Sequence, residues 1–309
     1  MITSFKPPVF RLRFLRTMQR PVPICHLLNI AQKDNLPSKK DGFVRLLHFS
    51  DIHIGLSPSL RELLFTKRIL GYLNHLIRRK HRIHVDFIQS LAQLLPQLQP
   101  DAVLCTGDLS SIGISAEFQT AEKLLQPFKK YNLIYVPGNH DRYVSDEKAF
   151  DTLHQTFRHC NPDGLQLDAL PAIHVVKGVA LILLNPACPV TYHLSCGILN
   201  TVMQHRVDEL LEDIPEETPR AIACHFPPLM PNDTLAGWRH GLRGASFLAA
   251  KLKEGKVDAI LSGHEHKPFL LKMPRGQLQL CAGSLTLEGS YTICDFPNQP
   301  CAAGLYPQS

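Results

Sequence analysis

The sequence predicts an α/β protein whose helices cover mixed β-sheets, and three observations support this prediction. The chain has 309 residues, of which 44% are hydrophobic and 19% charged, and these are ordinary values for a globular protein. In its first half, short strand-like runs alternate with longer helical patterns. In its last part, several strand-like runs follow one another. A layered arrangement of sheets and helices is therefore expected.

Local residue patterns place the individual elements along the chain. Runs rich in β-branched and aliphatic residues predict strands at 43–49, 102–105, 132–136, 173–176, 179–185, 221–224, 257–261, 269–271, 278–281 and 291–296. Apolar residues at helical spacing predict helices at 59–80, 84–98, 115–129, 145–158, 199–213 and 244–254. The dipeptide Lys177-Gly178 predicts a hairpin turn between two of the strands.

Two segments carry the positive charge of the chain. The formal net charge is +6, but residues 1–40 alone carry +7, residues 61–82 carry +6, and the remainder is acidic. Proline-containing breaks separate the first segment from the rest of the chain. We therefore expect residues 1–40 to be a poorly ordered basic tail and residues 41–309 to form the folded domain. An alternative for part of the tail is a short interfacial membrane helix, since apolar residues and arginines take opposite sides of a helix there.

Composition also excludes several classes of protein. The longest unbroken apolar run is Val179–Leu184, far shorter than the ~18 residues of a membrane-spanning helix. The nine cysteines are scattered without a C-x-x-C pair, so we expect a reducing, cytoplasmic location rather than a disulfide framework. Because no Phe, Tyr or Trp lies among the basic residues 78–82 of segment 61–82, no specific nucleic-acid partner is expected. Its charge favours peripheral contact with anionic lipid at the inner membrane surface.

Five of the predicted strands end in residues that commonly bind metal ions. Sites in open α/β sheets form outside the carboxyl ends of the strands, so these residues are expected to converge. Their oxygen and imidazole donors, with no thiolate, suit Zn²⁺, Mn²⁺ or Fe. Seven ligands are too many for one ion and suit two ions that share a carboxylate. The candidate ligands are Asp51, His53, Asp108, Asn139, His225, His264 and His266.

Two local features should aim these ligands. Residues i and i+2 of an extended segment face the same way, so Asp51 and His53 are expected to reach one ion together, as are His264 and His266. A glycine precedes a candidate ligand in three of the motifs, where the absence of a Cβ atom permits a tight turn. These glycines are Gly107, Gly138 and Gly263.

The ordered motifs D-x-H, G-D, G-N-H-D, a lone H and G-H-x-H resemble those of the calcineurin-like metallophosphoesterase superfamily, over about residues 43–296. The resemblance implies a four-layer α/β/β/α sandwich with two mixed β-sheets. It also implies two divalent metal ions per chain, with Mn²⁺ the first choice and Fe, Zn²⁺ or Mg²⁺ as alternatives. The first ion would be held by Asp51, His53, Asp108 and His266. The second would be held by Asp108, Asn139, His225 and His264, with Asp108 bridging.

The same resemblance suggests roles for residues around the metals. His140 is the candidate proton donor, and Asp141 is expected to orient the catalytic segment. Asn139 and His140 would contact the substrate phosphate. Outside the motifs, Arg142, Trp238 and Arg239 are candidates for substrate contact, with ordinary packing as the alternative.

The function expected is hydrolysis of a phosphodiester or pyrophosphate bond by metal-activated hydroxide. Residues 59–85 are expected to form a basic helical flap beside the Asp51 motif, which favours a membrane-proximal lipid such as UDP-2,3-diacylglucosamine. However, His140 stands where the commonest form of that pyrophosphatase has Arg.

One alternative is a 3',5'-cyclic-nucleotide phosphodiesterase of class III type, which shares G-N-H-D and a Gly-Ser pair such as Gly283-Ser284. The other is a non-catalytic binding or scaffold protein, against which the complete ligand set argues. The sequence leaves the ester type and the oligomeric state open.

Overall fold

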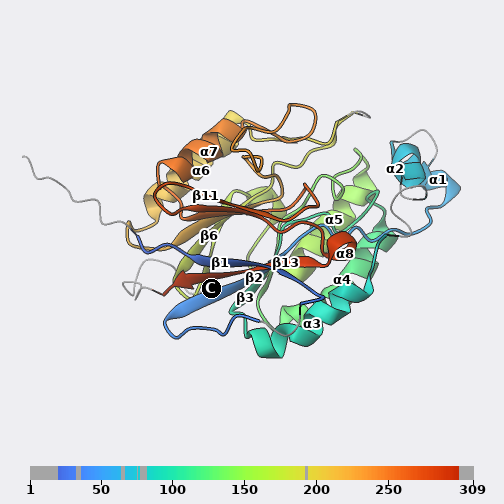
Figure 1. The fold of residues 1–309 in the computed structure, drawn as a ribbon. Coiled ribbons are helices and arrows are strands. Elements are labelled where there is room, and N and C mark those ends of the chain that lie inside the picture. The colour runs from blue at the N-terminus through green and yellow to red at the C-terminus, as the bar shows by residue number, and fades with distance from the viewer. Residues whose placement is uncertain are drawn as a thin grey trace, which may run out of the picture.

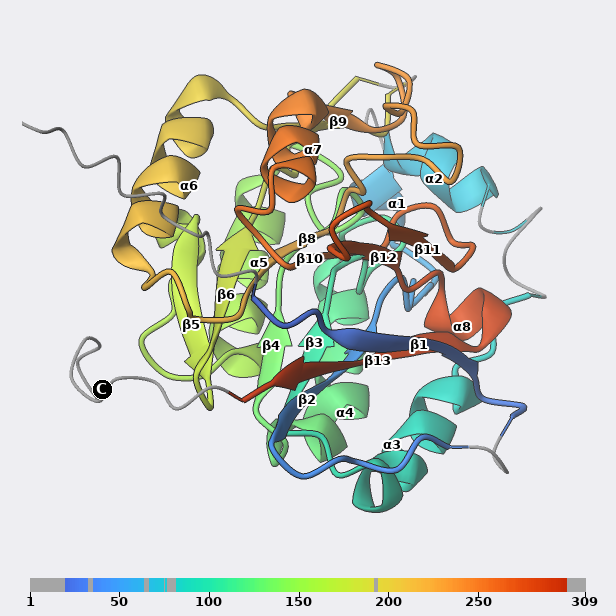
Figure 2. The same ribbon diagram turned by 60° about the vertical axis from the view of Figure 1, so that its left-hand side comes forward.

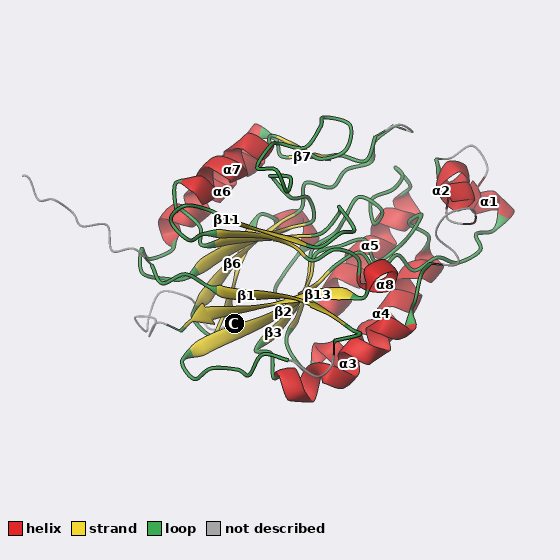
Figure 3. Cartoon of the chain, in the orientation of Figure 1, coloured by secondary structure: helices red, strands yellow, loops and turns green. Residues whose placement is uncertain are grey.

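Two mixed β-sheets packed face to face form the centre of the molecule (Figures 1 and 3). The computed structural model describes residues 20–32, 36–63, 67–74, 76, 82–191 and 194–298. The strands of the first sheet are, in order, β1 (Ile24–Asn29), β13 (Ser290–Pro297), β2 (Phe43–Phe49), β3 (Ala102–Cys105) and β4 (Leu133–Tyr135). Those of the second are β11 (Phe269–Lys272), β12 (Leu278–Cys281), β10 (Ala259–Ser262), β8 (Arg220–Cys224), β6 (Val179–Leu184) and β5 (Ala172–Val176). Each sheet contains both parallel and antiparallel pairs.

Helices cover the outer face of each sheet, as Figure 2 shows from a second side. The first sheet is covered by α3 (Asp86–Leu98), α4 (Ser115–Lys129) and α5 (Glu147–Cys160), with the short α8 (Leu285–Glu288) at one end. The second is covered by α6 (Thr201–Asp213) and α7 (Ala245–Lys253). The expected α/β architecture with two mixed sheets is confirmed, and its layers run helix, sheet, sheet, helix. The described residues also contain a short parallel pair, β7 (Gly197–Ile198) and β9 (Leu242–Arg243), and a 3-10 turn (Leu167–Ala169).

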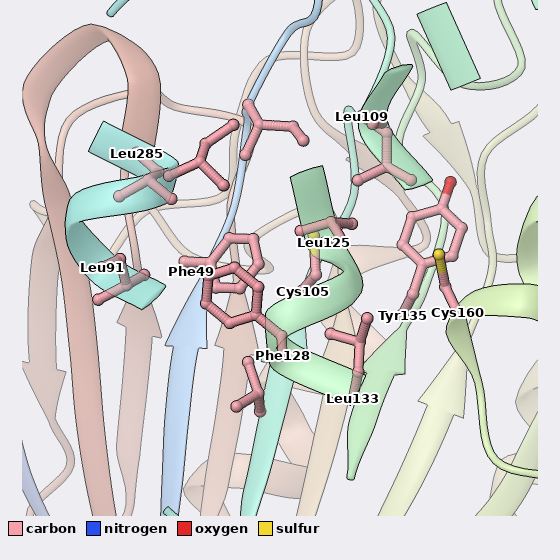
Figure 4. Close-up of a cluster of buried hydrophobic side chains, with 14 of the residues drawn as sticks. Phe49, Leu91, Cys105, Leu109, Leu125, Phe128, Leu133, Tyr135, Cys160 and Leu285 are labelled. Atoms are coloured by element: carbon pink, nitrogen blue, oxygen red, sulfur yellow. The ribbon is translucent and has the colours of Figure 1, made fainter. Parts of the chain in front are cut away.

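Alternating side chains divide the apolar residues into three buried layers. In β6, Ala180, Ile182 and Leu184 face α6 and α7, whereas Val179, Leu181 and Leu183 face the other sheet. On the far side, strands of the first sheet pack against α3, α4 and α5. Figure 4 shows this cluster, where the rings of Phe49 and Phe128 have centroids 5.3 Å apart. Burial on both faces explains why the central strands read as continuous apolar runs.

A buried ion pair joins the antiparallel half of the first sheet to its parallel half. The fully buried Arg45 guanidinium donates to both carboxylate oxygens of Asp295, at 2.7 Å from Nε and 2.7 Å from Nη2. It also donates to the backbone oxygens of Leu98, Pro37 and Ser38. This pair holds β2 against β13, and β2 leads directly into the segment that carries Asp51 and His53.

The expected boundary at residue 40 is wrong for part of the N-terminal segment. Ile24–Asn29 forms edge strand β1, which pairs antiparallel with β13 from Ile24↔Asp295 to Asn29↔Ser290. Arg20 also bonds to Asp258, with Nε 2.8 Å from Oδ1. Pairing with β13 satisfies the backbone N–H and C=O groups of this segment. The local composition does not reveal this pairing, because the partner strand is distant in the sequence. Residues 1–19, including those of the alternative membrane helix, lie outside the described residues.

The long helix expected at 59–80 is also wrong. The described parts of that segment contain two short helices, α1 (Leu60–Leu63) and α2 (Arg68–Asn74), while residues 64–66, 75 and 77–81 lie outside the description. Arg68 fixes α2 by donating to the backbone oxygens of Ile112 and Gly113. The other expected helices are confirmed within two residues at each end. Within the described ranges, no helix has the length and apolar character needed to cross a bilayer.

Candidate metal centre

The sheet topology brings the five predicted strand ends to one place. Strands β2, β3 and β4 are parallel neighbours in one sheet, and β8 and β10 are parallel neighbours in the other. Their carboxyl ends therefore lie at the same edge of the sandwich, where ligand sites form in α/β proteins. All seven candidate ligands meet there, and six of them are buried. The seventh, His266, is about a quarter exposed.

Four of the seven residues form a first group. The Nε2 atoms of His53 and His266 lie 2.9 Å apart, and each is 3.4 Å from Oδ1 of Asp51. Oδ2 of Asp108 is 3.7 Å from the same His53 nitrogen. One potential ligand atom from each of these residues lies within 4.8 Å of the others. This is the first metal set that the sequence motifs implied.

The remaining three residues form a second group around the same aspartate. Nε2 of His225 is 3.4 Å from Oδ2 of Asp108 and 3.1 Å from Oδ1 of Asn139. Nδ1 of His264 is 2.9 Å from that Asn139 oxygen and 3.3 Å from the His225 nitrogen. A single carboxylate oxygen therefore faces both groups.

The residues present fit a pair of divalent cations. Oδ1 of Asp51 is buried and has no hydrogen-bond partner within the protein, although it faces two histidine nitrogens. Two neutral imidazoles with Nε2 atoms 2.9 Å apart repel unless a proton or a cation lies between them. The donor set contains carboxylate, amide and imidazole groups, which suits Mn²⁺, Zn²⁺ or Fe. The geometry therefore fits a binuclear centre.

Hydrogen bonds to the protein aim the ligand atoms toward the centre. Nδ1 of His225 donates to the backbone oxygen of Thr106 at 2.6 Å, which leaves Nε2 to face the ligands. The backbone N–H of His264 donates to Oδ2 of Asp51, and that of His140 donates to Oδ1 of Asp108. Each aspartate is thus held through one oxygen while its other oxygen faces the histidines.

Five of the seven candidate ligands adopt left-handed backbone conformations. Their φ angles are 55° for Asp51, 43° for His53, 55° for Asp108, 74° for His264 and 57° for His266. Such conformations cost roughly 1–3 kcal/mol each in non-glycine residues and cluster at functional sites. The extended geometry expected for the i, i+2 pairs is therefore wrong. Asp51 and His53 still meet, but His264 and His266 belong to different groups.

A tight turn, the reason expected for all three glycines, explains only Gly107. Gly138 and Gly263 are needed for a different reason, because a side chain at either position would collide with its neighbours. Gly107 has a left-handed φ of 102°, as a tight turn requires. Gly138 and Gly263 do not, yet neither position has room for a side chain. A Cβ atom at Gly138 would lie 2.2 Å from Oδ1 of Asp108, and one at Gly263 would lie 2.4 Å from Oδ2 of Asp51. These glycines let the backbone approach the two carboxylates.

Burial and mutual charge shift the pKa values of the group in opposite directions. Burial disfavours ionised Asp51 and Asp108, but the surrounding histidines outweigh it and hold both pKa values well below the usual range. Burial also disfavours charged His225, yet the field of Asp108 raises its pKa to about 9. For His264, burial and then the neighbouring His225 hold the pKa well below its ordinary value. The metal-free group therefore attracts positive charge, whether protons or cations.

His140 and Asp141 lie beside the candidate ligands in different roles. Nδ1 of His140 donates to the backbone oxygen of Ser111 at 2.5 Å, so proton transfer by this ring would use Nε2. The Asp141 carboxylate points into the protein and accepts bonds from the Tyr135 hydroxyl and from the backbone N–H groups of Gly138 and Ser110. Asp141 therefore ties together the turns that follow β3 and β4, which is an orienting position.

The remaining candidates for substrate contact form cation–π pairs with or among neighbouring side chains. The guanidinium of Arg142 lies 5.1 Å from the ring centroid of Phe150, in a cavity of about 250 Å³ that Asp141 and Pro189 also line. Trp238 is 63% exposed, with the guanidinium of Arg239 5.2 Å from its ring centroid. This exposure excludes ordinary packing in the interior for Trp238, while substrate contact stays a prediction.

The sequence reasoning missed two aromatic side chains at the site. The ring of Tyr143 stacks on that of His140, with centroids 5.2 Å apart and planes at 15°. The ring of His240 lies 4.2 Å from that of His264, and its Nδ1 is 2.5 Å from Oγ of Ser195. Tyr143 lies three residues after His140, beyond the motif, and no pattern marks it. His240 directly follows Trp238 and Arg239 in the chain, and its place beside these two candidates for substrate contact could have indicated that it lies at the site.

Comparisons with known proteins agree with this geometry. Residues 44–268 match the model of the calcineurin-like phosphoesterase family. A cAMP/cGMP dual specificity phosphodiesterase of Mycobacterium tuberculosis is 29% identical over 208 residues, which is 62% of this chain and 59% of that protein. A transmembrane protein with metallophosphoesterase domain of Danio rerio is 30% identical over 122 residues, 39% of this chain and 22% of that protein. The chain thus spans about three fifths of the first relative and a fifth of the second.

Two solved structures show the same fold. A dimetal phosphatase from Danio rerio superposes with a TM-score of 0.56 at 12% identity, covering 82% of this chain and 92% of that one. The purple acid phosphatase PPD1 from yellow lupin superposes with a TM-score of 0.52 at 12% identity, covering 86% and 48%. At these identities the likeness concerns the fold alone.

Gly263→Ala tests the close approach of the backbone to Asp51. The new Cβ atom would lie 1.9 Å from Oγ of Ser50 and 2.4 Å from Oδ2 of Asp51, so the carboxylate must move. We expect at least ~10-fold weaker binding of Mn²⁺ at the first group and roughly 1–3 kcal/mol lower stability. Titration calorimetry and urea unfolding measure the two effects. Gly237→Ala is the control, because a Cβ atom there meets nothing within 4 Å. Equal Mn²⁺ binding by both variants would show that the approach is not needed.

The raised pKa of His225 predicts how the stability of the metal-free protein depends on pH. The folded pKa of about 9 exceeds the ordinary 6.5, so protonated His225 contributes stability that is fully present below pH 6.5. That contribution is lost as pH rises through about 9. In the presence of a chelator, the urea midpoint should fall over this interval, and less steeply in His225→Gln. The same slope in both proteins would contradict the assignment.

Proposed function

The chain belongs to the calcineurin-like phosphoesterase family, and we propose that it hydrolyses phosphodiester bonds at the centre where its two sheets meet. One observation carries the proposal. Oδ2 of Asp108 faces His53 in one group of ligands and His225 in the other, at 3.7 and 3.4 Å. A carboxylate shared between two complete sets of ligands is the arrangement that a binuclear hydrolase needs.

The proposed metal assignment follows the two groups. Asp51, His53 and His266 would hold the first ion and Asn139, His225 and His264 the second, with Asp108 shared. When bound, two divalent cations neutralise charge on the phosphoryl oxygens and make a water molecule acidic enough to supply hydroxide near neutral pH. Mn²⁺ is the first choice for a test, with Fe, Zn²⁺ and Mg²⁺ as alternatives.

Residues of the chain supply proton transfer and orientation. His140, with Nδ1 held by the backbone oxygen of Ser111, would present a proton on Nε2 to the leaving oxygen. The Asn139 amide, fixed between His225 and His264, would help to hold a phosphoryl oxygen. Asp141 would keep the loop that carries both residues in place through Ser110, Tyr135 and Gly138.

A phosphodiester is the substrate class best supported. The relative that matches 62% of the chain is described as a cAMP/cGMP dual specificity phosphodiesterase, which favours a 3',5'-cyclic nucleotide over the lipid pyrophosphate. His140 supports the same choice, because the commonest lipid pyrophosphatase has Arg there. A UDP-2,3-diacylglucosamine substrate and a non-catalytic scaffold are the outcomes against which the proposal is tested.

A substrate panel with Mn²⁺ tests the proposal. We expect turnover of bis(p-nitrophenyl) phosphate and of 3',5'-cAMP or cGMP to exceed that of p-nitrophenyl phosphate and of UDP-2,3-diacylglucosamine. Asp108→Ala should abolish activity and lower the metal content measured by mass spectrometry. His140→Ala should keep two ions while kcat falls by about 10²–10⁴-fold, the usual contribution of a general acid.

Three results would count against the proposed function. A preference for the lipid pyrophosphate would replace the substrate class. Fewer than one bound ion with no hydrolysis of any ester would favour the scaffold. Undiminished turnover in His140→Ala with both ions present would remove that residue from the mechanism.

We also propose that α2 mediates a peripheral contact with anionic membrane. Three neighbouring apolar side chains on this short helix face solvent, with exposed fractions of 40% for Ile69, 49% for Leu70 and 47% for Leu73. The segment 61–82 carries a net charge of +6 in the sequence. Arg68 and Lys67 donate hydrogen bonds to backbone oxygens of the protein. The proposal therefore rests on the exposed apolar residues and on the remaining positive charge of segment 61–82.

Vesicle flotation measures this contact. We expect the protein to float with vesicles that contain phosphatidylglycerol and not with pure phosphatidylcholine vesicles. The double variant Leu70→Ser/Leu73→Ser should lose most of the bound fraction. Val202→Ser, which changes a 74% exposed apolar residue on α6, should not. Equal recovery on both vesicle types would contradict an electrostatic lipid contact.

A further inference from the structure

The ring of His140 is held from three sides. Its Nδ1 atom donates to the backbone oxygen of Ser111 at 2.5 Å. The ring of His53 meets it edge-on, with centroids 4.9 Å apart and planes at 86°. The third side is the face of Tyr143, whose ring is nearly parallel to that of His140 at 5.2 Å. Ser111 contributes only its backbone here and His53 is a candidate metal ligand, so Tyr143 is the support that a side-chain variant can test by itself.

Tyr143 is in turn held by the segment around α2. Nζ of Lys67 lies 4.6 Å from the centroid of the Tyr143 ring, within the range of a cation–π interaction. The same Nζ donates to the backbone oxygen of Leu194 at 3.1 Å. Gly71 packs so closely that a Cβ atom there would lie 2.6 Å from the Tyr143 hydroxyl. The half-buried Tyr143 ring is therefore enclosed between α2 and His140.

Arg68 fixes α2 to the same loops. This buried side chain donates to the backbone oxygens of Ile112 and Gly113, at 3.2 and 2.9 Å, and its Nη1 bonds to the Asp146 carboxylate at 2.8 Å. Ile112 directly follows Ser111, whose oxygen accepts the bond from His140. The residues at the start of α2 therefore contact the loops on both sides of the proton donor.

We propose that Tyr143 is a positioning residue that fixes the His140 ring for proton transfer, and that α2 holds Tyr143 in place through Lys67 and Gly71. The kinetic part of this inference rests on the proposed function, in which His140 protonates the leaving oxygen. A ring fixed on its face and at Nδ1 keeps Nε2 in one direction, and such preorganisation decides the efficiency of a general acid. Loss of the face contact leaves rotation about the Cβ–Cγ bond less restricted.

Histidine side-chain NMR of the metal-free protein tests the placement without relying on activity. With the ring of Tyr143 stacked on it, the His140 ring protons should show an upfield ring-current shift, assigned by their loss in His140→Ala. Tyr143→Leu should remove that shift and broaden the signal, whereas Tyr143→Phe should keep it. Unchanged His140 signals in Tyr143→Leu would overturn the proposal, even if the protein hydrolyses no phosphate ester.

Leaving-group dependence tests the consequence for catalysis. A general acid matters most when the leaving group is a poor one, so Tyr143→Leu should lower kcat by ~10-fold or more for an alkyl phosphodiester. The loss should be smaller for p-nitrophenyl esters, and KM and the content of two Mn²⁺ ions should stay within twofold of the wild type. Tyr143→Phe should restore turnover, and Gly71→Ala and Lys67→Met should show part of the defect. Lys130→Met is the control, because Lys130 makes a similar contact with Tyr131 far from the site, at 5.2 Å.

A double-mutant cycle separates positioning from general damage. If Tyr143 acts through His140, adding Tyr143→Leu to His140→Ala should cause no further loss of kcat. Additive losses, or an equal loss for good and poor leaving groups, would mean that Tyr143 supports the site in another way. If no ester is hydrolysed but the NMR result holds, the proposed function fails while the placement of His140 stands.

Discussion

The structure depends on a buried carboxylate that two sheets share. Asp108 follows the central parallel strand of the first sheet, and its Oδ2 atom faces histidines from both halves of the sandwich. Buried negative charge is costly unless cations or donors surround it. Here the backbone N–H of His140 satisfies one oxygen, and the other faces the candidate metal ligands His53 and His225. The fold therefore keeps an attraction for cations at the point where its two halves meet.

Holding this arrangement has a conformational cost that the rest of the fold must offset. Five ligand residues adopt left-handed backbone conformations, at roughly 1–3 kcal/mol each. Three buried apolar layers and the Arg45–Asp295 ion pair stabilise the strands that lead into these turns. The strain is confined to the strand ends, while the strands themselves are regular. Rigid sheets thus allow the ligand turns to keep conformations that isolated segments would not adopt.

The contacts around His140 link the general fold to a feature of this chain. The charge of residues 61–82 predicts a basic helical flap, residues 59–85, beside the Asp51 motif. In the structure, its cations Lys67 and Arg68 contact Tyr143 and the loop after β3, so part of its charge serves internal packing. The exposed side chains described on α2 are the apolar ones of Ile69, Leu70 and Leu73. One segment thus combines an inner face that contacts Tyr143, beside the proposed proton donor His140, with an outer face for which we propose a surface contact.

The sequence by itself determined ten of the strands, most of the helices and the identity of all seven candidate ligands, but it did not predict β1, β7 or β9. These depend on local patterns, because apolar periodicity and short motifs at strand ends are read within a few residues. Only the tertiary structure decided that five of the candidate ligands adopt left-handed backbone conformations, that Ile24–Asn29 completes a sheet edge, and that Tyr143 stacks on His140. Each of these depends on backbone conformation or on partners distant in the chain, such as the pairing of β1 with β13 or the packing of α2 on Tyr143. Local composition does not indicate such contacts. The residues of β1 are equally compatible with a tail, the ligand residues with extended backbone, and Tyr143 with a place on the surface.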